Sequence, residues 1–278
     1  HHHYDITETF YRLWLDEQLV YTGAYFSDPE LTLEEAQRAK MDYVCRKLRL
    51  RPGEHVVEAG FGWGALALHM ARHYGVRVDA YNLSREQVLY ARRRAEAEGL
   101  DSLVTFIEDD YRRIAGKFDV FVSVGMLEHV GRRHYRQLGE VIDRCLKPAG
   151  RGLVHSIGRD QPAALDPWIK RRIFPGAYPP ALKEIMDVFQ PRGFSVLDVE
   201  NLRLHYARTL EHWLDRYQAN EQRVAEMFDQ PFVRMWRLYL AGSVVAFATG
   251  TLQLFQIVFT RPGANNISWT RAWLYEKP

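Results

Sequence analysis

The sequence has little cysteine and no long apolar run. Its two cysteines, Cys45 and Cys145, stand far apart inside helix-like segments, which excludes a disulfide framework and favours a reducing compartment. No run approaches the ~20 apolar residues that a membrane-spanning helix needs, and the N-terminus lacks the apolar core of a signal peptide. We therefore expect a cytoplasmic protein whose cysteines are small core residues.

A marked excess of charge of either sign is also missing. The chain holds 37 Lys and Arg residues against 35 Asp and Glu residues, a net charge of +2, so no global basic field attracts nucleic acid. It has no low-complexity tract and no internal repeat. We expect neither a nucleic-acid partner nor a bound metal. The leading histidines are either the end of a purification tag or native sequence, and we give His1 and His2 no functional meaning.

What is present is an ordinary globular composition, 47% hydrophobic and 26% charged. After residue 50, short apolar runs alternate with helical segments. The runs cover residues 55–59, 76–81, 104–107, 118–124, 152–157, 194–199 and 252–259. This alternation predicts an α/β fold with a doubly wound, seven-stranded and mostly parallel sheet.

We predict a single domain over residues 1–278, built from four stretches. Residues 1–50 form an N-terminal helical part, 51–158 a cofactor-binding half, 159–190 a cap insertion, and 191–278 the C-terminal helices and last strands. The insertion is rich in proline and aromatic residues and breaks the alternation. Because ligands of open α/β sheets bind at the carboxyl edge of the strands, we expect the insertion and the N-terminal helices to enclose the substrate there.

Three helical segments outside the alternation can be placed from the sequence. An aromatic segment at residues 4–15 predicts one helix. A second helix at 33–48 begins with a capping box formed by Thr32 and Glu35. A long helical stretch covers residues 206–248, with an interruption near Pro231 because proline breaks a helix interior.

A glycine-rich loop follows the first predicted strand. Gly60, Gly62 and Gly64 let the backbone turn sharply into a helix and approach a ligand closely. Gly60, Gly62 and Ala65 also satisfy the dinucleotide pattern, so an NAD-dependent oxidoreductase stays open on the loop alone. Glu58, however, would repel a pyrophosphate, whereas its carboxylate suits the amino group of a methionine moiety. The loop therefore favours S-adenosylmethionine, which is cationic and carries no phosphate.

Several motifs together resemble one family, the cyclopropane-fatty-acid synthases and mycolic-acid methyltransferases. They are Gly60-Phe61-Gly62-Trp63-Gly64, Met126-Leu127-Glu128-His129-Val130-Gly131, Ile173-Phe174-Pro175-Gly176, His205-Tyr206-Ala207-Arg208-Thr209-Leu210, and an N-terminal signature that starts at His3-Tyr4-Asp5. The resemblance extends from about residue 3 to about residue 260. It implies a class I, Rossmann-like methyltransferase fold. It also implies methyl or methylene transfer from S-adenosylmethionine to the double bond of an unsaturated fatty acyl chain or a similar apolar substrate.

The resemblance also implies roles for particular residues. The cofactor contacts are Tyr21, Thr22, Gly60, Gly62, Gly64, Asn82, Gln87, Asp110 and Tyr111, besides Glu58 from the loop chemistry. Closing a cyclopropane requires a base, which in this family is thought to be a bound bicarbonate. Its ligands here are Glu128, His155, the backbone of Ile157, and Tyr206. These four are the expected catalytic residues.

One position departs from the family. Gly23 stands where the family usually places a cysteine that helps to hold bicarbonate. The departure leaves open a methylated or methylene product, an N- or C-methyltransferase of a small natural product, and a non-catalytic ligand-binding relative. A competing explanation is that Gly23 only accommodates a backbone conformation with positive φ.

The substrate side offers two weaker signals. Residues 168–175 mix aromatic and basic side chains, which is typical either of peripheral contact with an anionic bilayer, such as the inner membrane surface, or of a solvated basic turn. An aromatic stripe lies in the long helical stretch, at Phe228, Phe232, Met235, Trp236, Leu238, Tyr239 and Leu240. The stripe is either an acyl channel or ordinary helix core.

Overall fold

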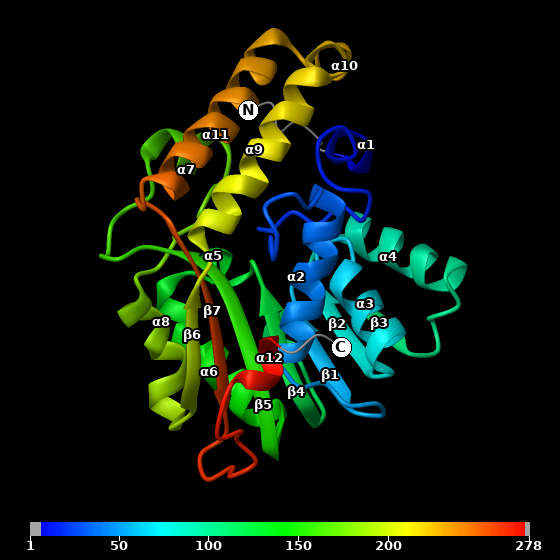
Figure 1. Ribbon diagram of the computed structural model, residues 1–278, viewed down its shortest axis with the longest axis vertical. Coiled ribbons are helices and arrows are strands. Elements are labelled where there is room, and N and C mark those ends of the chain that lie inside the picture. Colours follow the sequence, from blue (N-terminus) through cyan, green and yellow to red (C-terminus); the bar gives the residue numbers. More distant parts are fainter. Residues whose placement is uncertain (1–6, 276–278) are drawn as a thin grey trace.

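The computed structural model describes residues 7–275, so the signature at His3-Tyr4-Asp5 lies outside the described residues. A seven-stranded sheet in the order β3-β2-β1-β4-β5-β7-β6 forms its centre (Figure 1). The strands are β1 (His55–Ala59), β2 (Arg77–Asn82), β3 (Val104–Glu108), β4 (Phe118–Val124), β5 (Leu146–Gly158), β6 (Ser195–Asn201) and β7 (Gln253–Thr260). Among these seven strands, β7 runs opposite to the other six, so its pairings with β5 and β6 are antiparallel and the others are parallel. This is the mostly parallel sheet that the alternation predicted.

Helices cover both faces of the sheet. They are α1 (Glu8–Tyr11), α2 (Leu33–Lys47), α3 (Ala65–Tyr74), α4 (Arg85–Ala97), α5 (Leu127–Val130), α6 (Tyr135–Cys145), α7 (Pro167–Arg172), α8 (Leu182–Phe189), α9 (Arg203–Ala219), α10 (Glu221–Met227), α11 (Gln230–Ala248) and α12 (Ala272–Tyr275), with 3-10 turns at Tyr111–Arg113, Arg132–His134 and Gln190–Arg192. Neighbouring strand residues point to opposite faces. Val56 therefore packs with α2 and α3, while Val57 packs with α6 and α8.

A third hydrophobic cluster stands above the carboxyl edge of the sheet. It joins the N-terminal segment to α9 and α11, which lie at the top of the view in Figure 1. Phe10 and Trp236 meet there with ring centroids 5.0 Å apart, and Trp14 and Trp213 with centroids 5.5 Å apart. Through this aromatic cluster, the N-terminal segment and the helices α9 and α11 together enclose the space over the carboxyl edge of the sheet.

The predicted helix boundaries need two corrections. Within the described part of the aromatic segment, residues 7–15, the helix covers Glu8–Tyr11 alone, because the side chains are buried by tertiary packing and need no continuous helix. The long stretch is three helices rather than one with a single break: α9, α10 and α11. Pro231 sits in the first turn of α11, where proline fits, and Asp229 caps that helix. The capping box at Thr32 and Glu35 is confirmed.

The predicted insertion at 159–190 divides into two parts. Its first part carries α7, whose Trp168 and Ile169 pack against the aromatic cluster. Its last part is α8, whose Ile185 and Val188 pack in the layer with α6 under the other face of the sheet. Only the first part therefore faces the carboxyl edge. Both cysteines are buried and free, and within residues 7–275 no helix is both long and apolar enough to cross a membrane.

Candidate active site

The glycine loop joins β1 to the N-terminus of α3. Gly60 and Gly64 have φ values of +84° and +86°, in the left-handed region that favours glycine. A Cβ atom at Gly60 would stand 2.9 Å from Met126, and one at Gly64 would stand 2.9 Å from Ala91. Both positions therefore need glycine for conformation and for close packing.

Two substitutions in this loop separate these effects. Gly62 also has positive φ, +55°, but a Cβ there would meet nothing within 4 Å. We expect Gly62→Ala to lower the free energy of unfolding by about 1–2 kcal/mol, the strain of a left-handed L-residue. Gly64→Ala should lower it by a further ~1–3 kcal/mol, because overpacking adds to the strain. Urea unfolding measures both, and equal losses would show that packing at Gly64 is unimportant.

Glu58 lies at the end of β1, beneath this loop. It is 2% exposed, and burial raises the pKa of its carboxyl group to about 8 while nearby Lys40 opposes that rise. Its Oε2 atom is buried and has no hydrogen-bond partner within the described residues. A buried acceptor without a partner is costly, so Glu58 fits a site that is completed by a cationic or N–H-bearing ligand.

Asn82 and Gln87 meet beside the loop. Asn82 ends β2 and donates from Nδ2 to the Gln87 side chain (2.7 Å) and to the Gly62 carbonyl (3.3 Å). Ser84 caps α4 and fixes the backbone of Gln87. Asn82, Gln87 and the Gly62 carbonyl thus form one polar wall at the carboxyl ends of β1 and β2. A ribose would be bound at this place in this fold.

The expected adenine contacts lie along the next loop. The backbone N–H of Asp109 donates to the Asn82 carbonyl (3.1 Å), which brings the end of β3 beside β2. Asp110 is bound to Arg112 (2.8 Å), which holds the pKa of its carboxyl group below its usual range. Tyr111 is half-buried. The Asp110 side chain is therefore already paired with Arg112.

The N-terminal loop crosses the middle of the edge. Thr22 accepts from Lys40 Nζ through its hydroxyl (2.8 Å) and from Gln37 Nε2 through its carbonyl (2.8 Å). A Cβ at Gly125, just after β4, would stand 2.8 Å from Thr22. The Tyr21 hydroxyl lies 2.9 Å from that of Tyr239. The loop therefore links the cofactor side of the edge with α11.

Glu128 and His155 form the centre of the site. Glu128 Oε1 accepts from the Ile157 backbone N–H (2.6 Å), and burial raises the pKa of this carboxyl group to about 7. His155 Nδ1 lies 3.1 Å from Gln256 Nε2, and burial lowers the imidazole pKa well below its usual value. With the amide donating to Nδ1, the neutral ring carries its proton on Nε2. Glu128 Oε2 and His155 Nε2 both lack partners among residues 7–275.

Tyr206 and Gly23 face each other at this centre. The Tyr206 ring stacks on Phe247, with centroids 4.4 Å apart. A Cβ at Gly23 would stand 3.0 Å from the Tyr206 ring and 3.1 Å from Leu254. The φ of Gly23 is not in the left-handed region. The explanation of Gly23 by positive φ is therefore wrong, and a side chain at this position would point at Tyr206.

A mostly apolar cavity of about 580 Å³ connects these groups. All four expected catalytic residues line it, together with Tyr21 and Thr22; its other walls include Trp168, Ile169, Phe174, Leu210, Leu238, Gly242, Ala246 and Phe247. Glu58, the loop glycines, Asn82, Gln87, Asp110 and Tyr111 lie outside this cavity, on the neighbouring part of the edge. Of the aromatic stripe, only Leu238 and Tyr239 line the cavity, while Phe232, Trp236 and Leu240 are core residues.

Sequence reasoning missed three polar residues that support the site. Gln256 lies in β7 opposite His155, and Gln37 and Lys40 lie buried in α2. A lysine among the buried residues of a helix is an unusual signal. Burial lowers the pKa of Lys40 to about 8, and its contact with Thr22 connects α2 to the site.

Comparisons with known proteins identify the family to which this fold belongs. Residues 1–257 match the family model described as mycolic acid cyclopropane synthetase. A probable fatty acid methyltransferase of Pseudomonas putida is 39% identical and aligns with 99% of this chain and 72% of its own length. The cyclopropane-fatty-acyl-phospholipid synthase of Escherichia coli K12 is also 39% identical, over 97% of this chain and 69% of its own.

Solved structures of cyclopropane synthases are also similar to this chain. The cyclopropane synthase MmaA2 from Mycobacterium tuberculosis has a TM-score of 0.89 at 27% identity, covering 93% of this chain and 96% of its own. The mycolic acid cyclopropane synthase CmaA1, complexed with SAH and CTAB, has a TM-score of 0.88 at 28% identity, with the same coverage. The class I fold and the S-adenosylmethionine-dependent methyltransferase activity that the resemblance implied are confirmed. The chain belongs to the mycolic acid cyclopropane synthetase family.

Proposed function

We propose that this methyltransferase transfers a one-carbon unit from S-adenosylmethionine to the double bond of an unsaturated fatty acyl chain. The observation that supports this most is the mostly apolar cavity, because Glu128 and His155, which line it, each present a buried polar atom without a partner in the described chain. Two relatives are named for fatty acyl substrates, and the CmaA1 structure holds CTAB besides SAH. An apolar wall with a few placed polar groups suits such a ligand.

The cofactor side fits S-adenosylmethionine, which supplies an electrophilic methyl group when bound. The partnerless Oε2 of Glu58 matches its amino group, and the pair formed by Asn82 and Gln87 offers amide groups to ribose hydroxyls. We assign Tyr21 and Thr22 to closing this site from above. Asp110 and Tyr111 complete it at the end of β3.

At the reacting centre, addition of a methyl group to an alkene leaves a cation on the neighbouring carbon. We propose that Glu128 faces this cation, because its Oε1 is fixed by Ile157 while its Oε2 is free to interact. Ring closure then requires loss of one proton from the added methyl group. Bicarbonate fits beside Glu128 Oε2, His155 Nε2 and Tyr206, the groups that line this point of the cavity.

Substitutions at Gly23 test whether this position affects the binding of bicarbonate. A cysteine side chain there would extend toward Tyr206, so Gly23→Cys should restore a ligand and lower the bicarbonate concentration that half-stimulates turnover severalfold. Gly23→Ala adds the same Cβ without the thiol and should not. Each should also lose ~1–3 kcal/mol of stability from overpacking. Product assays at graded bicarbonate measure this, and an identical response of the two variants would exclude a bicarbonate-binding role for position 23.

The cavity mouth supports peripheral contact with an anionic bilayer. On α7, the basic residues Lys170, Arg171 and Arg172 are exposed while Trp168 lines the cavity. Leu238 also lines the cavity and is 59% exposed. Basic side chains beside exposed apolar ones are typical of an interfacial surface.

Incubation with phospholipid vesicles tests the proposed function. Vesicles of monounsaturated phospholipid should gain the mass of one methylene group per acyl chain in the presence of S-adenosylmethionine. Vesicles with saturated chains of equal length are the matched control and should gain nothing. Modification of both lipids, or of a small amine in their place, would favour an N- or C-methyltransferase instead.

A further inference from the structure

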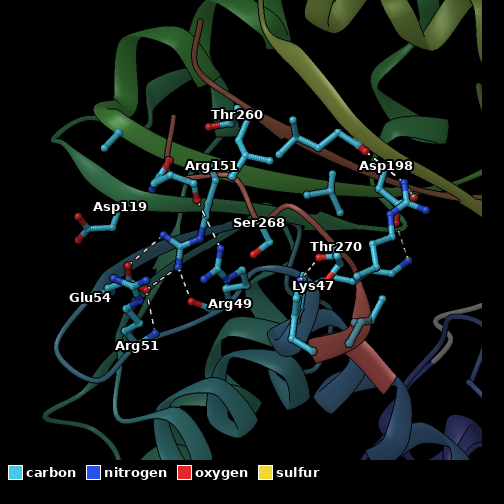
Figure 2. A pocket seen from close by; sticks show the side chains of 18 of the residues that line it. Lys47, Arg49, Arg51, Glu54, Asp119, Arg151, Asp198, Thr260, Ser268 and Thr270 are labelled. Atoms are coloured by element: carbon cyan, nitrogen blue, oxygen red, sulfur yellow. Dashed lines mark hydrogen bonds and ion pairs between the residues drawn. The ribbon is translucent and has the colours of Figure 1, made fainter. Parts of the chain in front are cut away.

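A second cavity of about 490 Å³ opens at the opposite edge of the sheet (Figure 2). Its walls come from the amino ends of β1, β4 and β5, the end of β7, and the C-terminal segment at residues 266–274. It shares no lining residue with the reaction cavity. Part of its wall follows residue 257, where the match to the family model ends.

The lining of this cavity has more cations than anions. Six basic residues line it, namely Lys47, Arg49, Arg51, Lys147, Arg151 and Arg271, against three acidic ones. Each acid is paired: Glu54 with Arg151 at 2.7 Å, Asp119 with Lys147 at 2.8 Å, and Asp198 with Arg271 at 2.9 Å. Lys47 pairs with Glu200. The guanidinium groups of Arg49 and Arg51 have no carboxylate partner in the described chain; that of Arg49 donates to the Asn266 carbonyl (3.4 Å).

Arg49 is held in position over this space. Its backbone is in the left-handed region, with φ of +49°, a conformation that a non-glycine residue keeps only when its surroundings hold it. Arg151 Nη2 donates to the Arg49 carbonyl (2.7 Å), and the Arg49 guanidinium lies 5.6 Å from the centroid of the Trp273 ring. Figure 2 shows Arg49 and Ser268 beside the pair formed by Arg151 and Glu54.

The remaining walls are uncharged: Thr260, Asn266, Ser268 and Thr270 are polar, and the others are apolar. Leu197 and Val258 come from the sheet, and Ile267, Trp273 and Leu274 come from the C-terminal segment. That segment is attached by specific contacts, such as Arg46 Nη1 to the Leu274 carbonyl (2.9 Å). Because Arg51 is exposed and Arg49 is half-buried, the unpaired charge lies toward the rim and the apolar surface lies beneath the segment.

We propose that this cavity is a second ligand site, which binds an anionic amphiphile. Its carboxylate or phosphate head pairs with the guanidinium groups of Arg49 and Arg51, which suit planar, two-point recognition of such oxygens. Its alkyl chain lies against the C-terminal segment, beside Trp273. The ligand neutralises the two unpaired cations and covers apolar surface. The inference is independent of the proposed reaction, since it involves none of the same residues.

Photo-crosslinking with peptide mapping tests this site on the full chain. The probes are a ten-carbon carboxylate and a ten-carbon phosphate monoester, each with a diazirine in the chain, and the uncharged alcohol of the same length. The two anions should label residues 266–274, and the stronger label identifies a fatty acid or a phosphate monoester as the natural class. The alcohol should label the reaction cavity alone.

Substitutions of Arg49 and Arg51 test whether the labelling of residues 266–274 depends on these two side chains. Arg49→Gln and Arg51→Gln should each lower labelling of 266–274 at least fivefold and leave labelling of the reaction cavity unchanged. Arg77→Gln removes an exposed arginine at the start of β2 and should change neither. Equal labelling of 266–274 by the alcohol in the parent protein, labelling unaffected by both substitutions, or no label there at all would overturn the proposal.

Discussion

Replacing Glu128 by glutamine is expected to reduce turnover by about 10²–10³-fold, the loss typical when one group that stabilises charge in the transition state is removed. The amide keeps the shape of the side chain and can still accept from the Ile157 N–H. What it loses is the negative charge at Oε2, which faces the reacting centre. Binding of S-adenosylhomocysteine, measured by calorimetry, should be unchanged because Glu128 lies outside the cofactor side of the edge.

The pH profile gives this prediction a second readout. Burial raises the pKa of the Glu128 carboxyl group to about 7, so turnover by the parent should fall as the pH drops below 7 and the carboxylate is protonated. Glu128→Gln should lack this acid limb. Glu184→Gln is the matched control, since Glu184 is buried but lines neither cavity, and it should keep both turnover and profile. Turnover of Glu128→Gln at the parent's rate would remove Glu128 from the mechanism.

Replacing Glu58 by glutamine is expected to weaken cofactor binding by roughly 1.5–3 kcal/mol, the value of a charge-assisted hydrogen bond. This corresponds to a dissociation constant about 10- to 150-fold higher. The physical reason is the partnerless Oε2 beneath the glycine loop, which a cationic ligand would satisfy. Calorimetry with S-adenosylmethionine measures the loss directly.

The stability of Glu58→Gln shows whether weaker cofactor binding results from a lost contact or from unfolding of the variant. The pKa of Glu58 is raised to about 8 in the folded protein, so the native state holds a proton between about pH 4.5 and 8 that the unfolded chain has released. Stability without ligand therefore falls as the pH rises through this window. Glu58→Gln should remove that fall and melt no lower than the parent at pH 8. Unchanged affinity in a stable variant would take Glu58 out of the site.

The sequence predicted the structure best where a local pattern of residues determines a strand or a loop. The run at 118–124 is β4 because its five buried residues lie on both faces of the strand and show no helical spacing. The start of β5, from Leu146, was missed because Pro148 and Gly150 interrupt its apolar pattern. The loop glycines were found because positive φ and close packing leave no other residue type at Gly60 and Gly64.

Other parts depended on contacts between distant segments. Trp236 and Tyr239 belong to one apolar stripe on α11, yet only Tyr239 reaches the cavity, since the N-terminal segment packs on Trp236. Gln256 became part of the site through its register opposite His155 in neighbouring strands. Helical and strand periodicity predict which residues are buried, but they do not tell which buried residues face a ligand.

Transfer of a deuterated methyl group tests the proposed reaction most directly. The protein is incubated with S-adenosylmethionine that carries a trideuteriomethyl group and with vesicles of monounsaturated phospholipid, and the acyl chains are analysed by mass spectrometry. We expect the label in the chain that held the double bond. Two deuterium atoms in a ring that mild hydrogenation does not reduce as an alkene would identify cyclopropane formation, since ring closure removes one deuteron. Three would identify a methyl branch. Deuterium that appears only in the lipid headgroup or in a small amine, with none in the acyl chain, would contradict acyl-chain transfer.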